Sequence, residues 1–155
     1  MQFKFAKINV VNPKDKMNNK DLEKKIKQII YSVAYEKWFV CAVDLLIKLE
    51  YLSKDDYDSW RFGKISYLEK VCQVNLNKLH IINNEIRKFA NELKLEPSWT
   101  AYDKYGKGAK SRLRFSISGA KNTEDVYATH YVNKIRTAEI KMTKASLKKM
   151  KGRIM

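Results

Sequence analysis

The sequence is poor in cysteine, proline and glycine, with two, two and five of each in 155 residues. Cys41 and Cys72 lie in stretches with helical apolar spacing, without a CxxC spacing and without a histidine nearby. Zinc sites and disulfide frameworks have characteristic cysteine spacings, and these spacings are missing. We therefore expect two buried free thiols in a reducing compartment, and we expect no metal and no other cofactor.

The chain also lacks a long apolar run. Its longest apolar stretches fall far short of the ~20 residues that a membrane-spanning helix needs. Its first residues alternate between polar and apolar types, whereas a signal peptide has a basic flank before an apolar segment. These absences predict a cytoplasmic protein without a membrane partner.

Acidic residues are scarce relative to basic ones. The chain has 32 Lys and Arg against 17 Asp and Glu, which gives a net charge of +15 and a pI near 9.7. Residues 1–99 contain 18 basic and 13 acidic side chains, whereas residues 100–155 contain 14 basic and 4 acidic ones. A surplus of this size, concentrated in the last third of the chain, favours a polyanionic partner such as nucleic acid.

Helical spacing dominates the middle of the sequence. Apolar residues three and four positions apart between residues 20 and 49 predict two helices or one long bent helix. Ser53 is a candidate N-cap with two acids after it, and Gly63 is a candidate stop for the helix between them. Residues 66–72 predict another short helix, residues 75–94 the clearest amphipathic helix, and Thr123 an N-cap for a helix over residues 124–132.

A period of two predicts strands at both ends of the helical region. Residues 3–11 predict a first strand with a bulge, and residues 98–118 predict a hairpin made of SWTAY, a glycine-containing loop and SRLRFSIS. The fold class is therefore a mostly helical α+β single domain, in which the N-terminal strand and the hairpin form a small antiparallel sheet. The domain spans residues 1–133, and residues 134–155 form a basic, partly helical tail.

The returning strand of this hairpin suggests a binding face. Alternation places Leu113, Phe115 and Ile117 on one side, and Arg112 and Arg114 on the other. The arginines would contact phosphates, and the adjacent tyrosines would stack on unpaired bases. The predicted nucleic-acid site consists of Tyr102, Lys104, Tyr105, Lys107, Lys110, Arg112 and Arg114, with Lys134, Arg136, Lys148, Lys149 and Lys151 of the tail. The tail either orders on a polyanion or forms a helix from Lys144, with Leu147 and Met150 docking back.

Two other motifs offer alternatives. Residues 66–90 resemble a helix-turn-helix in outline, with Asn77, His80, Asn84, Arg87 and Lys88 on the exposed face of its second helix, although a solvated helix face explains the same residues.

Tyr127, His130 and Tyr131 would share one helical face and could act in acid–base or nucleophilic chemistry. The sequence offers no paired acids for a metal and no glycine-rich phosphate loop. A histidine among tyrosines more commonly satisfies a hydrogen bond at the edge of a core. We therefore expect that the protein is not an enzyme.

These observations predict a nucleic-acid-binding protein that favours RNA or single-stranded DNA. The alternative is a small phage or mobile-element regulator or inhibitor that binds a protein or a nucleoprotein complex, since small size and high charge fit both. Oligomeric state and sequence specificity stay open.

Overall fold

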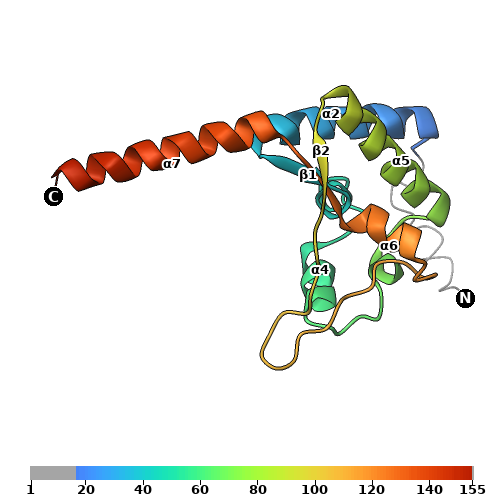
Figure 1. Ribbon diagram of the computed structural model, residues 1–155. Coiled ribbons are helices and arrows are strands. Elements are labelled where there is room, and N and C mark those ends of the chain that lie inside the picture. Colours follow the sequence, from blue (N-terminus) through green and yellow to red (C-terminus); the bar gives the residue numbers. More distant parts are fainter. Residues whose placement is uncertain (1–16, 155) are drawn as a thin grey trace, which may run out of the picture.

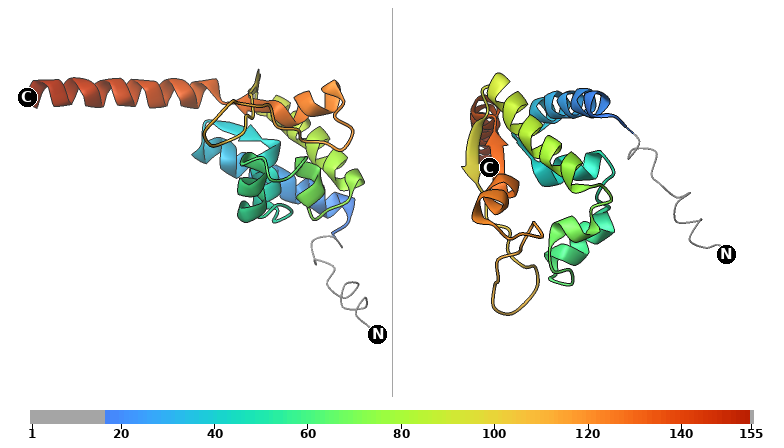
Figure 2. Two further views of the ribbon diagram at one scale, coloured as in Figure 1. Left: turned by 90° about the horizontal axis from the view of Figure 1, so that it is seen from below. Right: turned by 90° about the vertical axis from the view of Figure 1, so that its right-hand side faces the viewer.

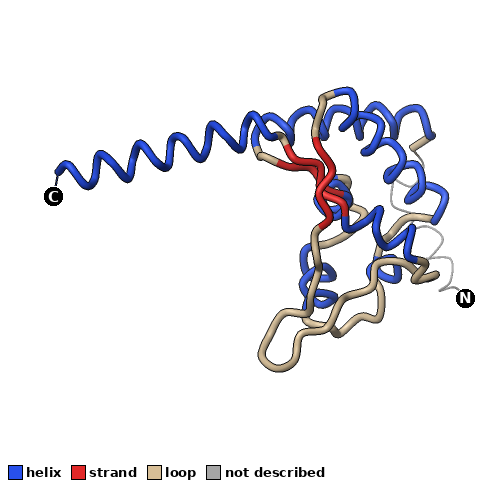
Figure 3. Tube along the Cα trace, viewed as in Figure 1, coloured by secondary structure: helices blue, strands red, loops and turns tan. Residues whose placement is uncertain are grey.

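A computed structural model describes residues 17–154 of the chain, and they form a helical body from which one long helix projects (Figure 1). The predicted α+β class, mostly helical with a small antiparallel sheet, is confirmed (Figure 3). In chain order the elements are α2 (Asn19–Glu36), β1 (Phe39–Cys41), α3 (Ala42–Lys48), α4 (Lys54–Arg61), the 3-10 helix η2 (Leu68–Val71), α5 (Leu76–Glu92), β2 (Glu96–Trp99), α6 (Lys121–Ala128), β3 (Thr129–Val132) and α7 (Lys134–Ile154).

The helix signals at Ser53 and Gly63 and over residues 75–94 are confirmed, whereas the predicted helix over residues 66–72 is only the 3-10 helix η2. The Ser53 hydroxyl accepts the backbone N–H of Asp56 at 3.1 Å and caps α4, and Gly63 follows this helix with a φ of +77°. A left-handed residue after a helix is usually glycine, because other side chains are strained there. The apolar stripe before Ser53 divides into α2 and α3. The predicted cap Thr123 and the predicted helix end at residue 132 are wrong, because α6 runs from Lys121 to Ala128 and its N-cap residue is Ala120.

The sheet is built from strands other than the predicted ones. Its order is β1-β3-β2, and both pairings are antiparallel. The predicted strand over residues 3–11 lies outside the described residues, and β2 overlaps only the start of the predicted strand 98–102. β1 and β3 arise in segments that we predicted as helical. Both segments contain aromatic and β-branched residues, which suit strands, and pairing with distant segments outweighs the helical period of their neighbours.

The predicted returning strand over residues 111–118 is wrong. Within the part of the chain that the structure describes, one isolated bridge, between Asp103 and Arg112, joins the two halves of the predicted hairpin. Ser116 is buried and Ile117 is exposed, so the predicted alternation of faces fails after Phe115.

Carboxylates hold this segment where a partner strand was expected. The two oxygens of Glu124 accept the backbone N–H groups of Phe115 and Ser116, both at 2.8 Å. Glu69 accepts the N–H of Ile117 at 2.9 Å, and the Glu69 and Leu68 N–H groups donate to carbonyls of the same segment. Hydrogen bonds to charged acceptors are stronger than neutral ones, so two side chains replace the ladder of a strand.

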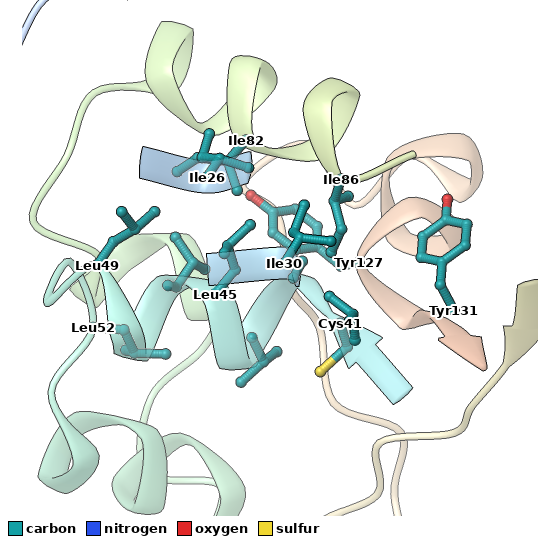
Figure 4. Close-up of a cluster of buried hydrophobic side chains, with 14 of the residues drawn as sticks. Ile26, Ile30, Cys41, Leu45, Leu49, Leu52, Ile82, Ile86, Tyr127 and Tyr131 are labelled. Carbon is teal, nitrogen blue, oxygen red and sulfur yellow. The ribbon is translucent and has the colours of Figure 1, made fainter. Parts of the chain in front are cut away.

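The main core forms where α2 and α5 pack against each other and against α3. Figure 4 shows Ile26 and Ile30 of α2 beside Ile82 and Ile86 of α5, with Tyr127 of α6 reaching into the same cluster. All five side chains are almost completely buried. Burying a side chain such as Ile contributes roughly 1.5–3 kcal/mol, so this packing accounts for the cohesion of the body.

A second group of buried side chains centres on Trp60. Its ring centroid lies 5.8 Å from that of Tyr102 and 5.1 Å from that of Phe115, and Phe115 stacks in turn on Tyr127 at 5.3 Å. The Trp60 indole N–H donates to the carbonyl oxygen of Arg114 at 2.8 Å. This group ties α4 to the carboxylate-held segment and to α6.

Replacing Trp60 therefore tests how far this aromatic group stabilises the fold. We expect Trp60→Ala to lower the free energy of unfolding by about 3–5 kcal/mol, because it leaves a cavity and removes one of the two hydrogen bonds to the carbonyl oxygen of Arg114. The matched control is Trp38→Ala, a half-exposed tryptophan, which should cost about 1 kcal/mol or less. Urea unfolding followed by circular dichroism measures both, and equal losses would contradict the assignment of Trp60 as a core residue.

Candidate functional site

The most distinctive surface of the protein is the outer part of α7. Figure 2 shows this helix leaving the body and continuing away from it, and every residue from Lys141 to Arg153 is exposed. The predicted docking of the tail is wrong, because Leu147 and Met150 are 52% and 56% exposed. α7 starts at Lys134, where we placed the start of the tail; the division into domain and tail stays a prediction.

Four lysines form one line along this projecting helix. Lys141, Lys144, Lys148 and Lys151 follow one another at intervals of three, four and three residues, so they lie on one face, with about 5–6 Å between neighbouring Cβ atoms. We call these four residues the lysine ridge. At a rise of about 1.5 Å per residue the ridge is about 15 Å long. Lys149 and Arg153 extend the charge onto other faces of the helix.

The lysine ridge has no acidic partner among residues 17–154. The one acid of α7, Glu139, lies 3.4 Å from the guanidinium of Arg136. Lys134 is paired with Glu96 of β2 at 2.5 Å. The two predicted site residues in the first turn of α7 are therefore already neutralised, whereas the predicted residues Lys148, Lys149 and Lys151 have no acidic partner in the described part of the chain.

The first turn of α7 fixes the helix to the body. The side-chain oxygen of Asn133 accepts the N–H of Arg136 at 3.0 Å, which caps the helix. The Asn133 backbone N–H donates to the carbonyl oxygen of Trp38 at 2.7 Å, and its side-chain amide donates to Ala34 at 3.4 Å. These bonds set the direction in which the lysine ridge leaves the body.

The predicted binding residues before α6 have mixed surroundings. Lys107 and Lys110 are exposed, without an acidic partner in the described chain, and Lys104 packs its stem against Gly63. Tyr105 is 41% exposed, and the guanidinium of Arg61 covers one face of its ring at 4.0 Å.

The other aromatic residues of this region differ in exposure. Trp99 keeps 51% of its surface exposed beneath Arg112, whose guanidinium lies 4.9 Å from the ring. Tyr102 is buried against Trp60, so its ring is not open for stacking. We call Tyr105, Lys107 and Lys110, together with Trp99 at the end of β2, the aromatic loop. The segment between β2 and α6 forms a long loop that extends below α4 (Figure 1).

Arg112 and Arg114, which we predicted to contact phosphates, both have partners inside the protein. Arg112 forms an ion pair with Asp103 at 2.8 Å. Arg114 donates to the carbonyl oxygens of Ser116 and Ile117, and it lies over the ring of Tyr67. Arg114 thus stabilises the loop in which it lies. Its side chain packs closely against Gly119, where an added Cβ atom would lie 3.1 Å from the guanidinium Nε. Because residues 111–118 do not form a strand, the two arginines do not share the regular strand face that alternation predicted.

The candidate catalytic residues Tyr127, His130 and Tyr131 do not share one helical face. Because the helix stops at Ala128, His130 lies on β3, where its Nε2 is 2.7 Å from the hydroxyl of Tyr102 and its ring stacks on Phe39. Tyr127 donates to Glu69 at 2.6 Å, and burial raises the pKa of Tyr127 far above its usual range. Within residues 17–154 no group of three or more His, Cys, Asp or Glu side chains could hold a metal ion.

The two cysteines are free, with Cys41 buried and Cys72 half-buried. Burial raises the pKa of both thiols to about 12, so each stays protonated at neutral pH. The thiolate is the nucleophile and the metal ligand of cysteine chemistry, which leaves these two thiols inert.

No protein-family model, curated protein or solved structure matches the chain. None of the helices in the described part of the chain has the length and apolar character of a membrane span.

Sequence reasoning missed two parts of this surface. It did not identify Glu69 and Glu124 as the acceptors that hold residues 115–117, because isolated glutamates carry no positional signal. It also did not show that Asn84 and Arg87 of α5 face the sheet across a groove.

The environment of His130 makes stability depend on pH. Burial lowers the pKa of His130 more than the Asp44 carboxylate raises it, and the imidazole lies against Tyr102 and Phe39. The unfolded chain then binds the proton more tightly, so the free energy of unfolding falls as pH falls through about 6.5. We expect the loss between about pH 7.5 and pH 5 to be smaller in His130→Gln than in the native protein.

The other histidine provides the control. His80 is exposed, so His80→Gln should keep the native pH dependence in the same urea titrations. A His130→Gln protein whose stability changes with pH as the native protein does would show that this buried imidazole does not carry the effect.

Proposed function

We propose that the protein binds single-stranded nucleic acid, RNA or DNA, through the lysine ridge of α7, with the aromatic loop as a second contact. The observation that carries the proposal is the ridge itself. Four lysines lie in one line on a helix that projects from the body, and none has an acidic partner within residues 17–154. We place this activity in the cytoplasm.

Electrostatics favour a polyanion at such a surface. Clustering like charges on one helix face is unfavourable by a few tenths of a kcal/mol per pair, and no contact with the described body offsets it. A nucleic acid presents closely spaced phosphates, and lysines that neutralise them release condensed counterions. The binding energy of the ridge is therefore expected to depend strongly on salt.

Exposed rings support a preference for unpaired strands. Trp99 and Tyr105 each have a guanidinium over the ring and keep about half of their surface exposed, and Lys107 and Lys110 follow Tyr105 in the loop between β2 and α6. Bases stack on such rings with about 1–3 kcal/mol each, but only when they are not already stacked in a duplex. The specificity for single strands thus rests on the aromatic loop and the bulk of the affinity on the lysine ridge.

Neutralising the ridge tests the proposal. In Lys141→Gln/Lys144→Gln/Lys148→Gln/Lys151→Gln we expect about tenfold or greater weakening of single-strand binding, and a slope of log K against log salt that is shallower by about 3. Fluorescence anisotropy with labelled single-stranded RNA, single-stranded DNA and duplex DNA over a salt series gives both values. The four residues are exposed, so the variant should unfold at the native urea concentration.

The matched control removes the same charge from the body. Lys20→Gln/Lys24→Gln/Lys64→Gln/Lys70→Gln changes four exposed lysines away from α7, and its slope should shift by less than about 1. If both quadruple variants lose affinity equally, binding reflects overall charge and the ridge is not the site.

The apolar residues of α7 favour a second candidate, a regulator that binds a protein. Leu147 and Met150 lie one turn apart on the projecting helix, and both are exposed next to the ridge. An amphipathic helix with such anchors can lie in the groove of a partner protein.

Polar substitution separates the two candidates. Leu147→Gln/Met150→Gln should keep single-strand affinity within about twofold if phosphate contacts dominate. Loss of nucleic-acid binding in this variant, together with loss of a protein that co-purifies after nuclease treatment, would support the regulator.

A further inference from the structure

A groove with a volume of about 730 Å³ lies between α5 on one side and β2, β3 and α6 on the other. Sites for small molecules typically have volumes of about 300–1,000 Å³. Neither the lysine ridge nor the aromatic loop lines this groove. It is therefore a distinct surface of the body, and no part of the proposed function so far uses it.

The wall formed by α5 is rich in side-chain amides. Asn84, Arg87 and Asn91 follow at intervals of three and four residues on one face of the helix, and together they cover about 10 Å. Asn83 lies next to them but is only 8% exposed, and its side chain interacts with the hydroxyl of the buried Tyr127. The amides that are open to an occupant of the groove are therefore those of Asn84 and Asn91, which are exposed.

The opposite wall is mainly apolar. Leu95, Pro97, Val126 and the ring of Tyr131 line it. Its one acid, Asp125, is already bound by the Lys121 ammonium at 2.7 Å and by the indole N–H of Trp99 at 3.1 Å. The wall thus offers an apolar surface for a ring, and the carboxylate of Asp125 on it already has two partners.

Arg87 supplies a positive charge to the groove. It is exposed, and it has no acidic partner among residues 17–154, whereas the neighbouring Lys88 lies 3.9 Å from Glu85. Burial raises the pKa of the Tyr131 hydroxyl, and the positive charge of Arg87 opposes this shift. The groove therefore combines three kinds of group: amides that both donate and accept, an apolar wall, and one guanidinium.

We propose that this groove binds a nucleoside monophosphate unit, with the base between the amides of α5 and the apolar wall and the phosphate at Arg87. Side-chain amides form paired hydrogen bonds with adenine, and guanidinium groups bind phosphate. Adenine is thus the base that we expect in the groove, because its exocyclic amino group and ring nitrogen can pair with the exposed amides of Asn84 and Asn91. If the bound unit is an unpaired nucleotide of a longer strand, the inference rests on the proposed function. A free mononucleotide presents the same chemical groups and would bind independently of that function.

The first experiment measures binding of the free ligand. We expect isothermal titration to detect AMP, and to find ribose 5-phosphate, which lacks the base, bound about tenfold or more weakly. Asn84→Ala/Arg87→Gln should weaken AMP binding by about tenfold or more, because it removes one amide and the cation. Asn77→Ala/Lys48→Gln removes the same two kinds of group from exposed positions outside the groove, and it should bind AMP as the native protein does.

The second experiment identifies the source of the nucleotide. Anisotropy compares an adenine oligonucleotide with an abasic one of the same length, in the native protein, the groove variant and the lysine-ridge variant. A preference for adenine that disappears only in the groove variant shows that the groove holds a nucleotide of the strand, even if free AMP does not bind. Groove-dependent AMP binding without that preference shows that the ligand is a free mononucleotide.

Two results separate this inference from the proposed function. Equal binding of both oligonucleotides through the lysine ridge, with no AMP binding, would overturn the groove site and leave the ridge intact. Groove-dependent AMP binding by a protein that binds no oligonucleotide would support the groove and overturn the proposed function.

Discussion

The pairing of β3 with two other strands is the constraint on which the rest of the structure depends. β3 is the central strand, so it joins β1, which follows α2, to β2, which follows α5. Its side chains contribute Tyr131 to the groove and His130 to the contact with Tyr102. α7 begins two residues after β3 ends, so the same pairing that closes the body also directs the projecting helix and places the groove wall.

Charge and packing are divided between different parts of the molecule. The body buries its apolar stripes and pairs several of its acids with nearby cations, whereas the outer part of α7 buries nothing against the described chain. An isolated helix as short as this outer part, residues 141–153, is marginal in water, because most helical stability in proteins comes from tertiary packing. A polyanion along the lysine ridge would remove the repulsion between its charges and stabilise the helix. Binding and helix formation are coupled in this account.

The sequence predicted the helical part of the fold better than its sheet or its site. Residues 75–94 and the cap at Ser53 were predictable, because burial on one helix face and capping are local effects. β1, β3 and the segment held by Glu69 and Glu124 were not, since their hydrogen bonds go to residues far away in the chain. The charge of the tail was visible in composition, but which cations stay unpaired depended on contacts such as that of Lys134 with Glu96. The groove depended on bringing α5 beside β3, which periodicity cannot show.

Hydrogen–deuterium exchange of the native protein, with and without a single-stranded RNA in excess, tests the central claim most directly. The backbone amides of residues 141–153 are the ones to follow, because in the free protein only the hydrogen bonds of the helix protect them. The account predicts rapid exchange there without RNA and marked slowing with RNA, while α2 stays unchanged. RNA-dependent slowing confined to the body, with α7 exchanging as before, would contradict it.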